Sequence, residues 1–285
     1  MINAWASGRG SWGCKEVARG RDPGAPAQSE ASASFEPSAR GMRLAVRASM
    51  RMKAIALGFA IMAAMVAAFG LERGWWRLNH PDPDRFPVWG LDVSHHQGPI
   101  DWAAVSAEPR IRFAYIKATE GGDFADPLFE QNWRAARRAG LKVGPYHFFS
   151  FCRPAADQAR NFLARVPRDA DALPPALDLE YGGNCRTVPA PATVQREVAT
   201  WLEAVERELG RRPVIYVTAE TYGAYLRRSN LRYPVWIRDV VSEPDLGEDA
   251  PWAFWQFHNR GRVAGIERHV DLNVFRGDRG KLDGM

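Results

Sequence analysis

The chain has 285 residues, 46% hydrophobic and 25% charged, which is the composition of a globular protein with one large or two small domains. Of its 38 basic and 33 acidic residues, nine and four lie in residues 1–53, which leaves 29 of each sign elsewhere. The positive excess therefore belongs to an N-terminal leader. Because the remainder is neutral and has no basic stripe, we expect no nucleic-acid partner.

Residues 1–53 are rich in Gly, Ala, Ser, Arg and Pro, which predicts a disordered basic leader that need not all be translated. Residues 54–71 form an uncharged apolar run after a basic flank, an order typical of either a signal peptide or a membrane anchor. The positive-inside rule puts everything after this run outside the cytoplasm, periplasmic or secreted. An uncleaved run would tether the protein to the inner membrane, with residues 72–86 as a linker.

From Val88 onward, strand-like apolar runs alternate with helical patterns, which predicts a parallel sheet. Eight such runs favour a closed, TIM-like α/β barrel over residues 87–277, followed by a tail at 278–285. The last three runs leave little room for helices, so the C-terminal half should be irregular. Strands are predicted at 90–94, 113–118, 142–149, 176–181, 214–218, 235–238, 253–257 and 270–275, and helices at 127–139, 155–166, 192–209 and 220–227.

Asp178 and Glu180 end the apolar run that begins at Pro174. On a strand, residues two apart share a face, with Cα atoms roughly 6.5 Å apart. Two acids on one face of a buried strand cost desolvation free energy, which favours a functional role. The alternative is a strand end with one acid in a salt bridge and the other solvated.

Several acids fall on or just after predicted strands. In a parallel barrel the carboxyl ends of the strands converge on one face, where barrel enzymes keep their active sites. A pocket lined by carboxylates is what glycoside hydrolysis uses. The acids are Asp92, Glu120, Asp178, Glu180, Asp239 and Asp271.

Short motifs occur in a fixed order between Pro87 and Phe275: GLDVSHHQG at 90–98, IDW at 100–102, FAYIKATEG at 113–121, GPYHF at 144–148, LDLE at 177–180, VWI at 235–237, WQF at 255–257 and VDLN at 270–273. In this order they resemble the glycoside hydrolase family 25 lysozymes, also called Chalaropsis-type muramidases. The resemblance implies an irregular, flattened α/β barrel. It also implies cleavage of the β-1,4 bond between N-acetylmuramic acid and N-acetylglucosamine in peptidoglycan, without a cofactor.

The resemblance also implies roles for four acids, since the family's acidic site positions correspond to Asp92, Asp178, Glu180 and Asp271. Glu180 matches the general acid, which needs a raised pKa, and Asp178 would supply a like charge beside it. Asp178 is also expected to orient the 2-acetamido group, so that the acetamido oxygen acts as internal nucleophile with retention. Direct attack or water activation by Asp178 or Asp92 is the alternative. Asp92 and Asp271 are assigned to positioning.

Four further residues of these motifs are candidate substrate contacts. Tyr146 and Trp236 resemble sugar-binding aromatics, although a plain core role is equally open. Glu120 and Gln256 are expected to bind substrate from the same face.

Cys152 and Cys185 follow the third and fourth predicted strands. Adjacent parallel strands bring these loops together, so outside the cytoplasm a disulfide is expected, with two free thiols as the alternative. Cys14 lies in the leader and would be unpaired.

His95 and His96 suggest a metal site. Adjacent residues on a strand face opposite ways, so we expect no metal there. Instead, one histidine should be packed and hydrogen-bonded and the other should lie near the cleft.

The sequence thus predicts an exported peptidoglycan muramidase whose partners are glycan strands and, if residues 54–71 are retained, the membrane. Two alternatives remain. One is a non-catalytic peptidoglycan-binding protein of the same fold, and the other is a hydrolase of another N-acetylglucosamine polymer such as chitin.

Overall fold

The computed structural model describes residues 39–183, 185–247 and 252–285, in two units, Met1–Gly58 and Phe59–Met285. Helix α1 (Ala39–Glu72) is long and apolar enough to cross a membrane, by length and composition. It begins before the apolar run, so residues 39–53 are helical where the sequence predicted disorder. Their Ala, Leu, Met and Arg are strong helix formers, which explains the difference. The rest of the predicted leader, with Cys14, lies outside the described residues.

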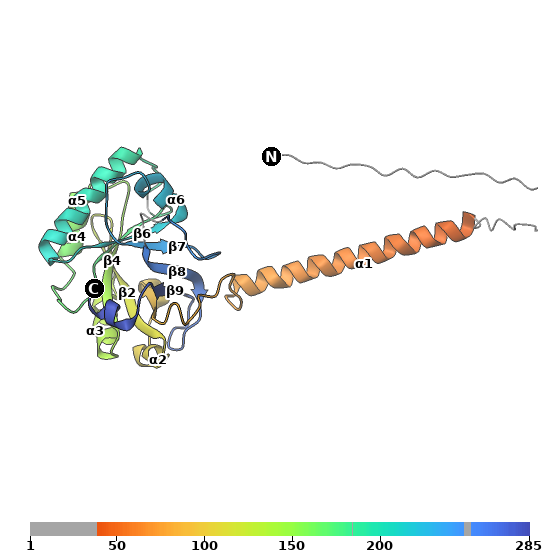
Figure 1. Cartoon of the computed structure of the whole chain (residues 1–285), viewed down its shortest axis with the longest axis horizontal. Helices are drawn as coiled ribbons and strands as arrows, with labels where there is room; N and C mark the ends of the chain where they lie inside the picture. The colour runs from red at the N-terminus through yellow and green to blue at the C-terminus, as the bar shows by residue number, and fades with distance from the viewer. Residues whose placement is uncertain (1–38, 184, 248–251) are drawn as a thin grey trace, which may run out of the picture. The chain divides into compact units, whose positions relative to one another are not determined.

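The unit Phe59–Met285 contains a closed barrel of eight strands, and β1 pairs with β2 to close it (Figure 1). A two-residue strand that the sequence analysis missed, β3, pairs with the end of β2 outside the barrel. The strands are β1 (Trp89–Val93), β2 (Ile111–Glu120), β3 (Phe124–Ala125), β4 (Lys142–Phe148), β5 (Ala176–Leu179), β6 (Val214–Thr218), β7 (Val235–Arg238), β8 (Trp252–Gly261) and β9 (Val270–Phe275).

The barrel is not parallel throughout, which corrects the prediction of an all-parallel sheet. β9 runs antiparallel to both β1 and β8. The physical reason is the short connection between β8 and β9, because a parallel pair needs a long crossover and an antiparallel pair needs only a hairpin. As a result, the N-terminal end of β9 meets the C-terminal ends of the parallel strands.

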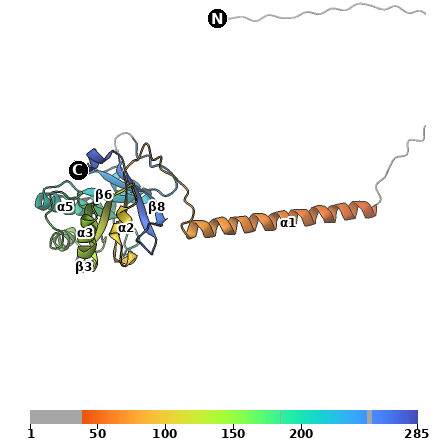
Figure 2. The same ribbon diagram turned by 90° about the horizontal axis from the view of Figure 1, so that it is seen from below.

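Helices cover the strands mainly in the first part of the barrel, and α3 and α5 lie outside the strands in both views (Figures 1 and 2). Between β7 and β9 the described residues contain no helix, in agreement with the expected irregular half. The helices are α2 (Trp102–Ser106), α3 (Phe129–Arg138), α4 (Ala155–Leu163), α5 (Pro191–Leu209), α6 (Ala219–Thr221), α7 (Arg279–Asp283), the 3-10 turn η1 (His95–Gln97) and the π-helical turn η2 (Tyr222–Leu226).

Two segments that the sequence analysis took for a linker and a tail pack on the barrel. In the linker, Phe86 is buried, and Asn79 Nδ2 donates a hydrogen bond to Phe257 O at 3.1 Å. In the tail, α7 buries Leu282. The folded domain therefore extends beyond the predicted bounds of 87–277.

The barrel interior is filled by aromatic side chains. Tyr115 stacks on Trp236 at a centroid distance of 4.6 Å and meets Phe254 edge-on at 5.5 Å. All three are buried. This packed interior, which includes the pocket-lining Trp236, supports the polar residues at the strand ends.

Candidate active site

A cleft of about 450 Å³ opens at the end of the barrel where the parallel strands terminate. It contains every site residue that the sequence analysis named as a catalytic or substrate-binding candidate: Asp92, Glu120, Tyr146, Asp178, Glu180, Trp236, Gln256 and Asp271.

Asp239 is the one acid of the predicted convergence that does not line this cleft. Its Oδ1 accepts hydrogen bonds from the backbone N–H groups of Val241 and Ser242, each at 2.9 Å. The prediction for Asp239 was wrong because its carboxylate closes a turn directly after β7.

The two-residue spacing of Asp178 and Glu180 has the expected effect. Asp178 lies on β5 and Glu180 directly follows it, and both face the cleft. Leu177 and Leu179 point the other way and are fully buried in the layer between strands and helices.

The Asp178 carboxylate is buried, with only 9% of the residue exposed. Its Oδ1 has no hydrogen-bond partner among the described residues. Burial raises the pKa of Asp178 well above its ordinary value, and the neighbouring charge of Glu180 raises it further. A buried carboxylate oxygen without a partner, facing a cleft, is available to a ligand.

Glu180 is closer to the solvent and has a cationic partner. Arg238 Nη1 lies 3.2 Å from Glu180 Oε2, with side-chain exposures of 38% and 22%. Burial raises the pKa of Glu180, Arg238 opposes this shift, and the charge of Asp92 adds to it. Asp92 thus adds to the like-charge effect expected from Asp178, because the repulsion between Asp178 and Glu180 is mutual and raises the pKa of both.

Asp92 and Asp271 are direct partners across the antiparallel pair of β1 and β9. Asp92 Oδ2 accepts hydrogen bonds from Asn273 Nδ2 at 2.7 Å and from Gln256 Nε2 at 3.1 Å. Burial raises the pKa of both acids, and the charge of Asp92 raises that of Asp271 further. Burial therefore favours the protonated form of both acids.

The chain matches the family model of the glycosyl hydrolases family 25 over residues 91–266. The chain belongs to glycosyl hydrolase family 25. It is 37% identical over 207 residues to the uncharacterized protein YegX of Escherichia coli O6:H1, covering 71% of this chain and 75% of the relative. It is 35% identical over 215 residues to Lysozyme M1 of Streptomyces globisporus, covering 70% and 71%.

The fold is similar to the solved structure of a family 25 glycosyl hydrolase from Bacillus anthracis. The TM-score is 0.69 and the identity is 36%, and the match covers 73% of this chain and 97% of that one. The irregular α/β barrel that the sequence predicted is thus confirmed, and this chain is a glycoside hydrolase.

Three polar residues of this family 25 site, Tyr216, Arg238 and Asn273, were not predicted from the sequence. Tyr216 OH donates to Gln256 Oε1 at 3.0 Å, and Trp236 Nε1 donates to Asn273 Oδ1 at 2.7 Å. Arg238 pairs with Glu180. The sequence does contain a signal for Arg238 and Asn273. Arg238 follows Trp236 by two residues and Asn273 follows Asp271 by two, which puts each pair on one strand face.

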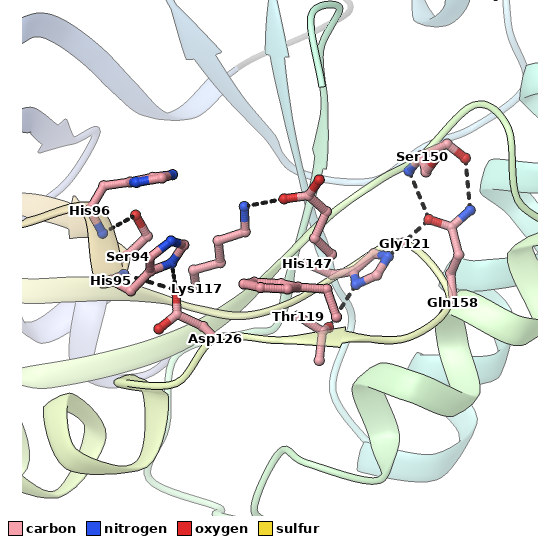
Figure 3. A network of polar contacts seen from close by, with 12 residues as sticks. Ser94, His95, His96, Lys117, Thr119, Gly121, Asp126, His147, Ser150 and Gln158 are labelled. Atoms are coloured by element: carbon pink, nitrogen blue, oxygen red, sulfur yellow. Dashed lines mark hydrogen bonds and ion pairs between the residues drawn. The ribbon is translucent and has the colours of Figure 1, made fainter. Parts of the chain in front are cut away.

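Lys117, labelled in Figure 3, forms an ion pair with Glu120 on the cleft wall of the hydrolase. Lys117 Nζ lies 2.7 Å from Glu120 Oε2 and 4.8 Å from the centroid of the Phe148 ring. Glu120, expected to bind substrate, thus already neutralises a buried lysine. The charge of Lys117 also lowers the pKa of Asp178 and of Glu180, opposing their burial.

His95 and His96 lie on the turn η1 and not on a strand. Their ring centroids lie only 4.1 Å apart, with the ring planes tilted by 39°, so the expectation that they face opposite ways was wrong. Figure 3 shows His95 bonded to Asp126, whose Oδ2 lies 2.8 Å from both the backbone N and Nδ1 of His95. His96 lines the cleft, so one histidine is hydrogen-bonded and the other is near the cleft, as expected.

His147 is fully buried against Phe162 of α4 and Trp201 of α5 and joins three elements (Figure 3). Thr119 Oγ1 donates to His147 Nδ1 at 2.7 Å, and His147 Nε2 donates to Gln158 Oε1 at 3.1 Å. Gln158 Oε1 also accepts from the backbone N–H of Ser150 at 2.8 Å. This network connects α4 to the ends of β2 and β4, and β2 also carries Lys117 and Glu120.

The expected disulfide is present between Cys152 and Cys185, with Cα atoms 5.6 Å apart. It links the segments that follow β4 and β5, and Gly183 in the second segment lines the cleft. The bridge therefore constrains one side of the active-site rim.

Proposed function

We propose that this chain is a muramidase that hydrolyses the β-1,4 bond between N-acetylmuramic acid and N-acetylglucosamine in peptidoglycan. The observation that carries the proposal is the meeting of Asp92, Asp178, Glu180 and Asp271 in one cleft of a family 25 barrel. The name of one relative, Lysozyme M1, supports the same substrate.

In the proposed mechanism Glu180 is the proton donor. Burial favours its protonated form, and it lies at the more solvent-accessible edge of the acid cluster. The proton of Glu180 passes to the glycosidic oxygen as the bond from that oxygen to C1 breaks. The same carboxylate then takes a proton from the water that completes hydrolysis.

Asp178 would orient the 2-acetamido group of the sugar at the cleavage point. Its unpartnered Oδ1 is a ready acceptor for the acetamido N–H. The acetamido oxygen then attacks C1 as an internal nucleophile, and water opens the cyclic intermediate with net retention. The alternatives are direct attack by Asp178 or Asp92, which also gives retention, and water activation by either residue, which gives inversion.

Asp92 and Asp271 are proposed to position substrate. The two amide donors on Asp92 Oδ2 hold its carboxylate in one orientation. Tyr146 and Trp236 line the same cleft and would contact the sugar rings, and Gln256 would act mainly by holding Asp92.

The proposed site of action is outside the cytoplasm, with α1 retained as a membrane anchor. The apolar helix and its basic flank support an anchor, and the disulfide is typical of an oxidising compartment. Edman sequencing of the mature protein would show whether α1 is retained.

The test is the release of reducing ends from purified peptidoglycan by the full chain in detergent, wild type beside Glu180→Gln. Loss of the general acid should lower the rate by about 10²–10⁴-fold. The matched control is Asp239→Asn, because Asp239 lies outside the cleft and should leave the rate unchanged.

The other outcomes separate the remaining functions. An inert wild type that still sediments with peptidoglycan would establish the binding protein of the same fold. Faster release from chitin than from peptidoglycan would make the chain a hydrolase of another N-acetylglucosamine polymer. Equal rates for wild type and Glu180→Gln would keep the enzyme class and remove Glu180 as proton donor. The anomer of the first product, followed by NMR, separates retention from inversion.

A further inference from the structure

Basic side chains from the β8–β9 hairpin bind the C-terminal end of α1, all within the unit Phe59–Met285. Arg260 Nη1 donates to Glu72 O at 2.7 Å, and Arg262 Nε and Nη2 donate to Arg73 O, each at 3.2 Å. His269 Nε2 lies 3.1 Å from the same Arg73 oxygen. The last carbonyls of a helix lack partners within it and attract cations, so these contacts fix the hairpin to the helix end.

The same region exposes aromatic and basic groups together. We define the collar as residues 72–80 and 258–269. In it, Trp75 is 61% exposed, Trp76 49% and Leu78 60%. The collar contains five arginines and three histidines against two glutamates. Arginines beside exposed tryptophans are the combination found where a protein meets lipid headgroups.

The depth of the collar relative to the bilayer follows from the position at which the apolar run in α1 ends. The apolar run ends at Leu71, and a bilayer core of about 30 Å takes up roughly 20 apolar residues. Residues directly after such a run lie among the headgroups. The side chains of Arg260 and Arg262 donate hydrogen bonds to the backbone oxygens of Glu72 and Arg73. The hairpin therefore has to lie at the same depth in the headgroup region as the end of the helix.

We propose that the collar binds the anionic phospholipid headgroups of the membrane that α1 enters, and holds the barrel directly on that surface. This rests on the proposed membrane anchor. Negative headgroups attract each arginine near the surface, and the attraction fades within a Debye length of about 8–10 Å.

The collar also adjoins the active-site cleft. Asn259 lines the cleft, and the next residue, Arg260, is bonded to the end of α1. Two residues before β9 begins, Arg268 Nη1 donates to the backbone oxygen of His96, which lines the cleft as well. One rim of the cleft therefore lies beside the collar, and the substrate would be glycan strands close to the membrane.

The test measures contact between the collar and lipid in the full chain. Cys14→Ser removes the cysteine outside the disulfide, and Ala264→Cys, on the exposed hairpin, carries a fluorescent dye. The chain is reconstituted into phosphatidylcholine vesicles with or without phosphatidylglycerol, doped with lipid that carries a nitroxide on its headgroup. Asp171→Cys is the control position, because Asp171 is 87% exposed on the segment before β5, at the opposite end of the barrel.

We expect strong quenching at position 264 that increases with phosphatidylglycerol, and little at position 171. Adding R73Q, R260Q and R262Q together should remove most of the quenching at 264. Adding R134Q, R160Q and R196Q, an equal charge change on α3, α4 and α5, should leave it intact. Cleavage of soluble glycan fragments should be unchanged in both, since none of these arginines lines the cleft.

Three outcomes would overturn the proposal. If the chain does not float with the vesicles, both the membrane anchor and lipid binding by the collar are rejected. The proposed muramidase function is tested separately by the activity in detergent. A chain that floats but shows equal quenching at 264 and 171 would remove the collar alone. Quenching at 264 that is indifferent to the three collar arginines would show that headgroup charge is not what the collar binds.

Discussion

Arg238 Nη1 lies 3.2 Å from Glu180 Oε2, so the proposed proton donor meets a guanidinium before any substrate arrives. A general acid has to hold its proton, whereas a neighbouring cation favours the carboxylate. Burial acts in the opposite direction and is the larger effect on the pKa of Glu180. Arg238 therefore moderates how far the pKa of this acid rises.

Replacing Arg238 by Met should move the alkaline limb of the pH–rate profile to higher pH. Without the guanidinium the carboxylate form of Glu180 loses a stabilising charge, so its pKa rises and the protonated form persists further. The measurement is kcat/KM against pH on peptidoglycan fragments. Arg85→Met is the control, since Arg85 forms an exposed ion pair with Glu243. An alkaline limb that stays in place would show that Arg238 does not act on the proton donor.

Asp178→Asn should stabilise the fold at neutral pH while lowering activity. The pKa of Asp178 is higher in the folded state than in the unfolded chain, so the folded protein binds the Asp178 proton more tightly. The stability of the fold therefore decreases as the pH rises above the pKa that Asp178 has in the unfolded chain. The neutral amide of the Asp178→Asn variant does not ionise, so this loss of stability with rising pH is absent. The unfolding free energy of the variant should exceed that of wild type at pH 7 and match it more closely near pH 4. Asp239→Asn should show no such gain. A less stable Asp178→Asn protein at pH 7 would contradict the argument.

His147 should make the protein sensitive to acid. Burial lowers its pKa to about 3, whereas the unfolded chain takes up the proton near 6.5. Stability from this residue is complete above pH 6.5 and is lost progressively as pH falls toward 3. In His147→Gln the unfolding free energy should change less steeply across that window. His80→Gln, at an exposed position, should keep the wild-type slope, and an unchanged slope in both variants would reject the role of His147.

The double variant Cys152→Ser with Cys185→Ser should lose about 3–4 kcal/mol of unfolding free energy, because the bridge closes 33 residues. Denaturant unfolding of both forms at one pH measures the difference. Cys14→Ser is the matched single change and should unfold like wild type. A double variant as stable as wild type would mean that the rim is held by its other contacts.

The sequence alone pointed to the acids because strand alternation is a local property. Asp178 and Glu180 share a face whatever surrounds them, and their position at the end of an apolar run marked them as part of the rim. The disulfide followed from the same order of strands. Asp239 shows the limit of such reasoning, because a carboxylate just after a strand can equally close a turn.

The bounds of the folded domain were harder to predict from the sequence than the acids or the disulfide. Residues 72–86 contain Pro, Asp and Arg and read as a linker, yet Asn79 and Phe86 are buried against strands far along the chain. Burial of this kind depends on a partner surface, and a single sequence does not display that surface.

The sequence by itself determined the barrel, the shared face of Asp178 and Glu180, and the cysteine pair, because each depends on spacing along single strands and on strand order. The tertiary structure alone decided which charges face one another. It placed Arg238 on Glu180, the amides of Gln256 and Asn273 on Asp92, and Arg260 on the end of α1. It also turned β9 antiparallel, which brings Asp271 opposite Asp92. These contacts join residues 58 to 188 positions apart, and only closure of the barrel brings them within hydrogen-bonding distance.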